Sequence, residues 1–126
     1  MKEPPFLLDA ARVLEYAPLD DAVRSAPGAH AVVGGVAVDT STVAGMAITE
    51  GLAQGEIFLL HCNENWETLA AGPVADAASA RASAELAFPG SARLWRAYRS
   101  LTAEELAEID STSAFLRELL AQDPDA

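Results

Sequence analysis

The apolar residues of this chain gather in short runs separated by glycine, proline, asparagine and aspartate, a pattern typical of β-strands joined by turns. In the segment Ile57–Cys62, apolar side chains fall on both alternating faces. A strand exposed to water on one side would alternate apolar and polar residues, so we expect this strand to be central and covered on both faces. Residues 63–65 then predict a turn, and residues 66–70 predict its partner strand.

Two more strand regions precede this central strand. Residues 30–38 hold two β-branched runs on either side of Gly34 and Gly35. This predicts a hairpin, because a two-residue turn with positive φ at both positions suits glycine. Residues 43–49 have the pattern of a further strand, although their alanines and glycine weaken it.

The N-terminal segment carries two competing patterns. Residues 6–14 follow two prolines and place apolar side chains at helical spacing, so we expect a short helix followed by an extended segment. A short strand over residues 13–17, ended by Pro18, is the alternative.

A helix is expected over residues 76–88. Asp76 is suited to cap its N-terminus, and the Pro-Gly pair that follows Phe88 ends it. Arg81 and Glu85 have the spacing of an ion pair on its outer side. Its inner face is formed by residues spaced three and four apart: Ala77, Ala80, Ala84 and Phe88.

A second helix is expected near the C-terminus. Thr102 and Glu105 form a capping box, and the helix that they open should run to about Leu120. The polar run at residues 110–113 leaves open a division into two helices. The candidate buried positions are Leu106, Ile109, Phe115, Leu116, Leu119 and Leu120.

Together these elements predict a single α+β domain over residues 1–126. We expect a mostly antiparallel sheet of about four to five strands between His30 and Ala71, with the first helix packed on one face. The C-terminal helix should pack at an edge or over the second face. The N-terminal segment, the last helix or a second subunit would complete the cover of the central strand, so a homodimer is one alternative.

The charge of the chain restricts its partners. Eight basic and nineteen acidic residues give a net charge of −11, and no lysine or arginine occurs between Arg24 and Arg81. This field repels nucleic acids and anionic membranes and attracts cationic partners. We therefore expect a basic protein partner, with no role in binding nucleic acid or membrane.

The single cysteine, Cys62, allows no internal disulfide. The N-terminus lacks the apolar stretch of a secretory signal, and no segment reaches the roughly 18 consecutive apolar residues of a membrane helix. These features lead us to expect a soluble cytoplasmic protein.

Two stretches of the chain, LLHCNENWETLAAG and SARASAELAFPGSARLW, resemble a pattern found in a family of small uncharacterised bacterial proteins. In that pattern a strand ends in Cys-Asp-Glu-x-Trp, and an Ala/Glu-rich helix ends in Tyr-Pro-Gly before a second tryptophan. This chain departs from it at Asn63 and Phe88. The resemblance covers about a third of the chain; it supports the expected architecture, carries over no catalytic residue and leaves the function open. The matching positions are Cys62, Glu64, Trp66, Leu69, Ala80, Ala84, Glu85, Pro89, Gly90 and Trp95.

The residues with catalytic potential are Cys62, His61 and His30. Adjacent strand residues point to opposite faces, so His61 and Cys62 cannot form a dyad in a regular strand. A reactive thiolate also needs positive neighbours, and none lie near Cys62 in sequence, which favours a buried inert thiol. The spacing of His30, His61, Cys62 and Glu64 is not that of a metal site, and we expect no metal and no cofactor.

The sequence therefore favours a non-catalytic binding module, similar to an immunity protein, that engages a basic protein. The expected binding residues are the acids of the segment without basic residues, Glu50, Glu56, Glu64 and Glu67. One alternative is a small-ligand protein or a thiol-dependent enzyme that uses Cys62 or His30. The other alternative is a structural subunit of a homo-oligomer.

Overall fold

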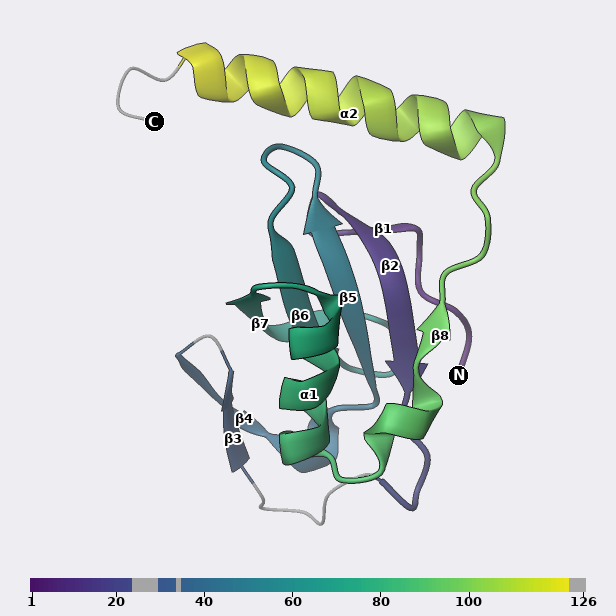
Figure 1. The fold of residues 1–126 in the computed structure, drawn as a ribbon, viewed down its shortest axis with the longest axis vertical. Coiled ribbons are helices and arrows are strands. Elements are labelled where there is room, and N and C mark those ends of the chain that lie inside the picture. Colours follow the sequence, from purple (N-terminus) through teal and green to yellow (C-terminus); the bar gives the residue numbers. More distant parts are fainter. Residues whose placement is uncertain (24–29, 34, 123–126) are drawn as a thin grey trace.

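The computed structural model describes residues 1–23, 30–33 and 35–122. It has the expected α+β architecture, with one large curled antiparallel sheet, a separate small sheet and two α-helices (Figure 1). The strands are β1 (Leu7–Leu8), β2 (Ala11–Pro18), β3 (His30–Val33), β4 (Val36–Asp39), β5 (Gly45–Gly51), β6 (Ile57–Cys62), β7 (Thr68–Val74) and β8 (Arg96–Ala97). The helices are α1 (Ala77–Ala87) and α2 (Ala103–Gln122), and two 3-10 turns are η1 (Thr40–Thr42) and η2 (Ser91–Leu94).

The large sheet has the strand order β1-β2-β5-β6-β7, and β8 pairs with β2. Strand β6 lies between β5 and β7, and its last four side chains, Leu59 to Cys62, are buried on alternate faces. Leu59 joins the core beneath α1, whereas Leu60 joins a second core with Cys62 and Trp66 on the other face. The prediction that this strand is central is therefore confirmed, whereas its cover is complete only from Leu59 to Cys62, because Ile57 and Phe58 are half-buried.

Helix α1 packs on the sheet as expected. The Asp76 carboxylate accepts a hydrogen bond of 2.8 Å from the Ser79 backbone N–H and so caps the N-terminus. Ala80, Ala84 and Phe88 are fully buried. Because the two alanines are small, the helix axis can approach the sheet closely, and Phe88 fills the space at its last turn.

The charges of α1 make different contacts from those expected. Arg81 does not pair with Glu85; its guanidinium lies 2.6 Å from the carboxylate of Glu15 on β2. Glu85 instead accepts hydrogen bonds from the backbone N–H groups of Gly90 and Ala92, at 2.8 and 2.9 Å. Both side chains thus connect α1 to other segments. An ion pair between them on the helix surface would stabilise the chain by only about 0.2–0.5 kcal/mol, less than these tertiary contacts.

The helix predicted over residues 6–14 is wrong. Strands β1 and β2 occupy this region and form a hairpin, with Asp9 and Ala10 at φ of 53° and 58° in its two-residue turn. Along its length β2 also pairs with β5. These backbone hydrogen bonds come from distant residues and outweigh the local helical spacing. The sheet therefore extends beyond the predicted limits of His30 and Ala71.

Two other strand predictions need adjustment. The hairpin over residues 30–38 is confirmed as β3 and β4, but it forms its own two-stranded sheet. Gly35 has the expected positive φ of 80°, whereas Gly34 lies outside the described residues. The strand predicted from Trp66 begins only at Thr68, because Trp66 adopts a left-handed turn conformation with φ of 59°.

Helix α2 is continuous through the polar residues 110–113 and is opened by the predicted capping box. It lies across the end of the sheet, above the β5–β6 turn (Figure 1). Of the six apolar positions predicted to be buried, only Ile109 is buried, and Leu116 is half-buried. The other four are exposed because the end of the sheet covers only part of this helix: Leu106, Phe115, Leu119 and Leu120.

Candidate functional site

The face of the sheet opposite α1 is divided into a filled half and an open half. Trp66 fills one half, and its indole N–H donates a hydrogen bond of 2.8 Å to the backbone carbonyl of Lys2. Tyr16 packs edge-on against the Trp66 ring at a centroid distance of 6.0 Å. Tyr98 closes the edge, since its hydroxyl donates to the carbonyl of Pro4 at 2.7 Å. The N-terminal segment therefore supplies part of the second cover.

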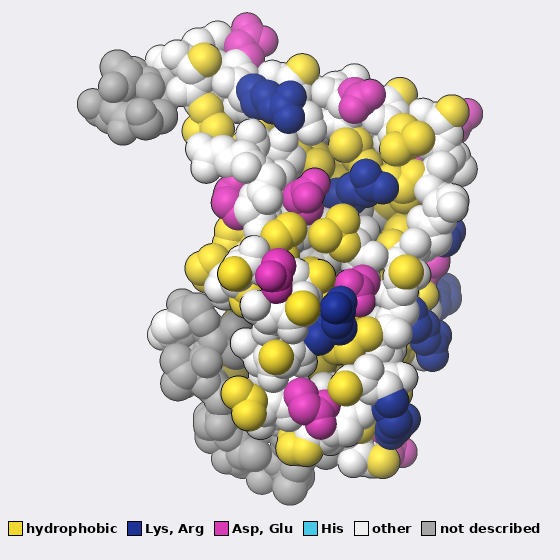
Figure 2. Space-filling view, viewed as in Figure 1, with side chains coloured by type: hydrophobic (Ala, Val, Ile, Leu, Met, Phe, Trp, Pro, Cys, Tyr) yellow, Lys and Arg dark blue, Asp and Glu magenta, His cyan; other side chains and the backbone are white. Residues whose placement is uncertain are grey.

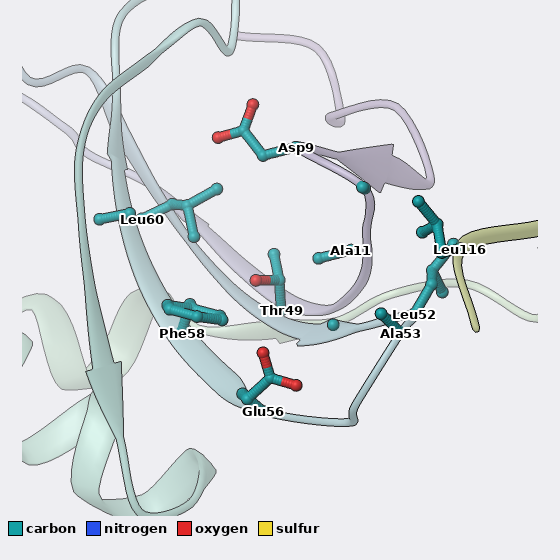
Figure 3. Close-up of a pocket in the computed structure, with 12 residues that line it drawn as sticks. Asp9, Ala11, Thr49, Leu52, Ala53, Glu56, Phe58, Leu60 and Leu116 are labelled. Carbon is teal, nitrogen blue, oxygen red and sulfur yellow. The ribbon is translucent and has the colours of Figure 1, made fainter. Parts of the chain in front are cut away.

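The open half holds a pocket of about 350 Å³ at the end of the sheet nearest α2 (Figure 3). The β1–β2 hairpin, the β5–β6 turn and one side chain of α2 surround it. Its volume is at the lower end of the range of roughly 300–1,000 Å³ for small-molecule sites. The side chains that define its chemistry are Asp9, Thr49, Glu56, Phe58, Leu60 and Leu116.

Three of these side chains are polar. Thr49 is fully buried, and its hydroxyl has no hydrogen-bond partner within the described part of the chain. An unsatisfied buried hydroxyl costs about 1–3 kcal/mol, so it calls for a water molecule or a ligand. Asp9 and Glu56 lie on opposite sides of the pocket, and the carboxylate of Glu56 turns toward Thr49 (Figure 3).

Cys62 lies deeper on the same face and is completely buried. Burial raises the pKa of its thiol from 9.0 to about 12, and the negative charge of Asp9 adds to this effect. The thiol is therefore protonated at neutral pH and is a poor nucleophile. His61 points to the α1 face, as expected for its neighbour on a strand, with its ring 5.8 Å from that of Phe88.

His61 is buried without a hydrogen-bond partner for either ring nitrogen among the described residues. Burial lowers the pKa of its imidazole from 6.5 to about 4, so the ring is neutral at physiological pH. The backbone of His30 begins β3, and its side chain lies outside what the structure describes. Among the side chains that the structure describes, no basic group acts on the Cys62 thiol.

The four glutamates predicted to bind a partner are all exposed, but they do not form one patch. Glu50 and Glu56 lie at the α2 end of β6, whereas Glu64 and Glu67 lie at its other end. The six residues of β6, at about 3.3 Å each, separate the two pairs by roughly 20 Å. Glu50 also stands directly opposite Arg12 across β2 and β5. Arg12 lies outside the segment without basic residues, but in the folded chain its positive charge partly offsets the negative charge of that segment.

A more continuous surface is found on α2. Phe115 is 60% exposed and Leu119 is 48% exposed, and their spacing of four places them on one side of the helix. Glu108 stands seven residues before Phe115, and Glu104 one turn further, so both acids extend the same stripe. We call these four residues the α2 stripe. Hydrophobic side chains are visible both along α2 and in the region directly beneath it (Figure 2).

The acids of the α2 stripe have no basic partner in the part of the chain that the structure describes. The neighbouring Glu105 differs, because Arg99 binds it at 2.7 Å and lowers the pKa of its carboxyl to about 2. Arg99 also binds Glu3 at 3.0 Å. The base of α2 is thus fixed to the N-terminal segment, while its outer face remains accessible.

Asp9 and Thr49 were not recognised from the sequence. Asp9 fell within the wrongly predicted helix, and Thr49 was one polar residue in a strand. Asp9 and Thr49 line the same pocket as Glu56 because the sheet curls, which the sequence does not reveal. Among the described residues, no group of three or more metal-binding side chains comes together.

Comparison with protein-family models, curated proteins and solved structures found no match to this chain. The resemblance to small bacterial proteins noted from its motifs therefore stays a prediction. In the part of the chain covered by the structure, no helix has both the length and the apolar character that crossing a bilayer requires.

Proposed function

We propose that this chain is a non-catalytic protein-binding module that engages a basic protein through α2, as a small immunity protein neutralises a cationic toxin. The observation that carries this proposal is the α2 stripe, in which exposed Phe115 and Leu119 share one side of the helix with Glu104 and Glu108, two acids that pair with no described basic residue. Exposed apolar residues with a polar border are typical of protein-binding surfaces.

The charge of the chain favours a basic partner over a second copy of itself. Helix α2 carries five acidic residues and a single arginine, Arg117, and the chain has a net charge of −11. Two copies that met through their α2 stripes would bring like charges together, which opposes association. A partner rich in lysine or arginine would instead be attracted before contact and would neutralise the acids on binding.

The position of α2 also divides the four glutamates that were expected to bind the partner into two pairs. Glu50 and Glu56 lie at the α2 end of the sheet, beside the proposed surface: Glu50 lines a groove that also holds Arg12 and Arg117, and Glu56 lines the adjoining pocket. Glu64 and Glu67 lie at the far end of β6 and are not part of the proposed surface. Glu64 and Glu67 therefore serve as a control for substitutions of Glu104 and Glu108, because the two pairs carry the same charge and all four side chains are exposed.

The experiment is capture of the partner from the native host with the immobilised chain, followed by identification and purification of the captured protein. The double variant Phe115→Asp, Leu119→Asp should abolish binding. The control is Leu86→Asp, on α1, because Leu86 is 87% exposed and lies away from the proposed surface. Equal loss of binding in both variants, or undiminished binding in the double variant, would contradict the proposal.

A second comparison tests the charge. Glu104→Lys with Glu108→Lys should weaken binding strongly, and the affinity of the wild-type chain should fall as salt is added. Glu64→Lys with Glu67→Lys changes the net charge equally and should have a smaller effect. A captured partner that is itself acidic, or an affinity that does not respond to salt, would refute the electrostatic part of the proposal.

A further inference from the structure

We propose that the pocket beneath α2 binds a small organic cation, a primary ammonium group carried on an apolar body. This site is separate from the α2 stripe, and the proposal does not depend on the protein-binding function. It rests on the pocket's shape and on the three polar side chains that line it, Asp9, Thr49 and Glu56.

The polar groups match the hydrogen-bonding capacity of an ammonium ion. A primary ammonium has three N–H donors and no acceptor. Asp9 and Glu56 offer carboxylates from opposite sides, and neither side chain forms an ion pair or hydrogen bond with another described residue (Figure 3). The third acceptor is the hydroxyl of Thr49, which is buried and unpartnered. One cation placed between Glu56 and Thr49 would satisfy these two groups, and Asp9, across the pocket, would add negative charge without a direct bond to it (Figure 3).

The remainder of the pocket is apolar. Phe58, Leu60 and Ala11 form its wall, and Leu116 of α2 lines it at one side (Figure 3). Phe58 offers an aromatic ring near the carboxylate of Glu56, where a cation gains further stabilisation from the ring face (Figure 3). An apolar wall with a few convergent polar groups is the usual composition of a small-molecule site.

Other classes of ligand fit less well. Two carboxylates repel an anion, and the described residues that line the pocket include no lysine or arginine. A calcium ion prefers six to eight oxygen ligands, and the pocket supplies two carboxylates and one hydroxyl. A neutral apolar molecule would leave both carboxylates without a partner at the entrance of an apolar space.

The test uses three probes of the same shape: phenethylamine, its neutral analogue 2-phenylethanol and the anion phenylacetate. Each is titrated into the full chain at neutral pH, with binding followed by calorimetry and by the backbone amide shifts of Thr49, Phe58 and Asp9. We expect saturable binding of the amine, at least about tenfold tighter than that of the alcohol, because a charged hydrogen bond is lost in the latter. The anion should not bind.

Variants locate the site. Asp9→Asn keeps the positive φ of the turn, which asparagine tolerates, and removes the charge. Glu56→Gln should weaken amine binding about tenfold, as expected for loss of a charged partner, and Asp9→Asn should weaken it less, because only a nearby charge is removed. Thr49→Val preserves the shape of the side chain and should also weaken it. The control Glu67→Gln should bind as the wild type does.

The proposal is overturned by any of three results: equal affinity for amine and alcohol, no saturable binding of the amine at millimolar concentration, or unchanged affinity in the folded Glu56→Gln and Thr49→Val variants. The variant Phe115→Asp, Leu119→Asp should retain amine binding. Its loss of protein capture would then be independent of the pocket, so the two proposals can fail separately.

Discussion

His61 gives the protein a specific dependence of stability on pH. Its side chain is 2% exposed, packs against Phe88 and lacks a hydrogen-bond partner in the described structure. Burial lowers the pKa of the folded-state imidazole to about 4, compared with 6.5 when it is exposed on unfolding. Because the folded state resists protonation, acid favours the unfolded state.

The size of the effect follows from the two pKa values. The contribution of neutral His61 is complete above the unfolded pKa of 6.5, is lost as the pH falls toward 4, and does not change further below that value. The difference of 6.5 minus 4 gives about 2.5 pKa units, or about 3 kcal/mol in total. Between about pH 7.5 and pH 5 the loss should be about 2 kcal/mol.

The assay is urea unfolding of the wild type and of His61→Leu, monitored by tryptophan fluorescence at several pH values in this range. Carboxylates shared by both proteins contribute equally, so the difference in their free energies of unfolding isolates His61. We expect the wild type to lose about 2 kcal/mol more than His61→Leu on acidification. Parallel losses in the two proteins would refute the reasoning, because they would show that His61 does not resist protonation.

Three further predictions concern packing and reactivity. Gly45→Ala should lower the free energy of unfolding by about 1–3 kcal/mol in urea, because its Cβ would stand 2.7 Å from the Trp66 ring; an unchanged value would contradict the packing of Trp66. Phe88→Ala should cost about 3–5 kcal/mol in the same assay, since Phe88 is fully buried, and a loss below 1 kcal/mol would be inconsistent with this core. Cys62 should react with a mild alkylating agent only at the rate of unfolding, measured by mass spectrometry, and rapid labelling of folded protein would restore it as a candidate nucleophile.

The elements that were predicted correctly are those whose residue pattern lies within a few neighbouring positions in the sequence. Ile57–Cys62 has apolar residues on both faces, and only a central strand accommodates that pattern. Asp76 caps α1, and Thr102 with Glu105 caps α2, through contacts within three residues in sequence. Interactions of this range can be read directly from residue spacing.

The N-terminal hairpin could not be predicted in this way. Its tight turn places Asp9 and Ala10 in the left-handed region, for which neither residue is a strong indicator. Its pairing with β5 joins residues more than thirty positions apart, such as Val13 and Thr49. The pocket depends on this pairing, and its polar side chains were therefore missed.

Helix α2 shows why apolar spacing does not guarantee burial. Leucine and phenylalanine recur along it as in a core helix, yet Phe115 and Leu119 remain exposed. The helix spans 20 residues, about 30 Å, and lies across the end of the sheet, which covers only part of it. The spacing of apolar residues therefore predicted burial that the described part of the chain provides fully only at Ile109.

The most direct test of the proposed function is the hydrogen-exchange footprint of the captured partner on this chain. Amide protection upon binding is predicted along α2 and at the β5–β6 turn, with no change at the turn that contains Glu64 and Glu67. Protection confined to that distant turn, with exchange of α2 unaltered, would contradict the assignment of α2 as the docking surface.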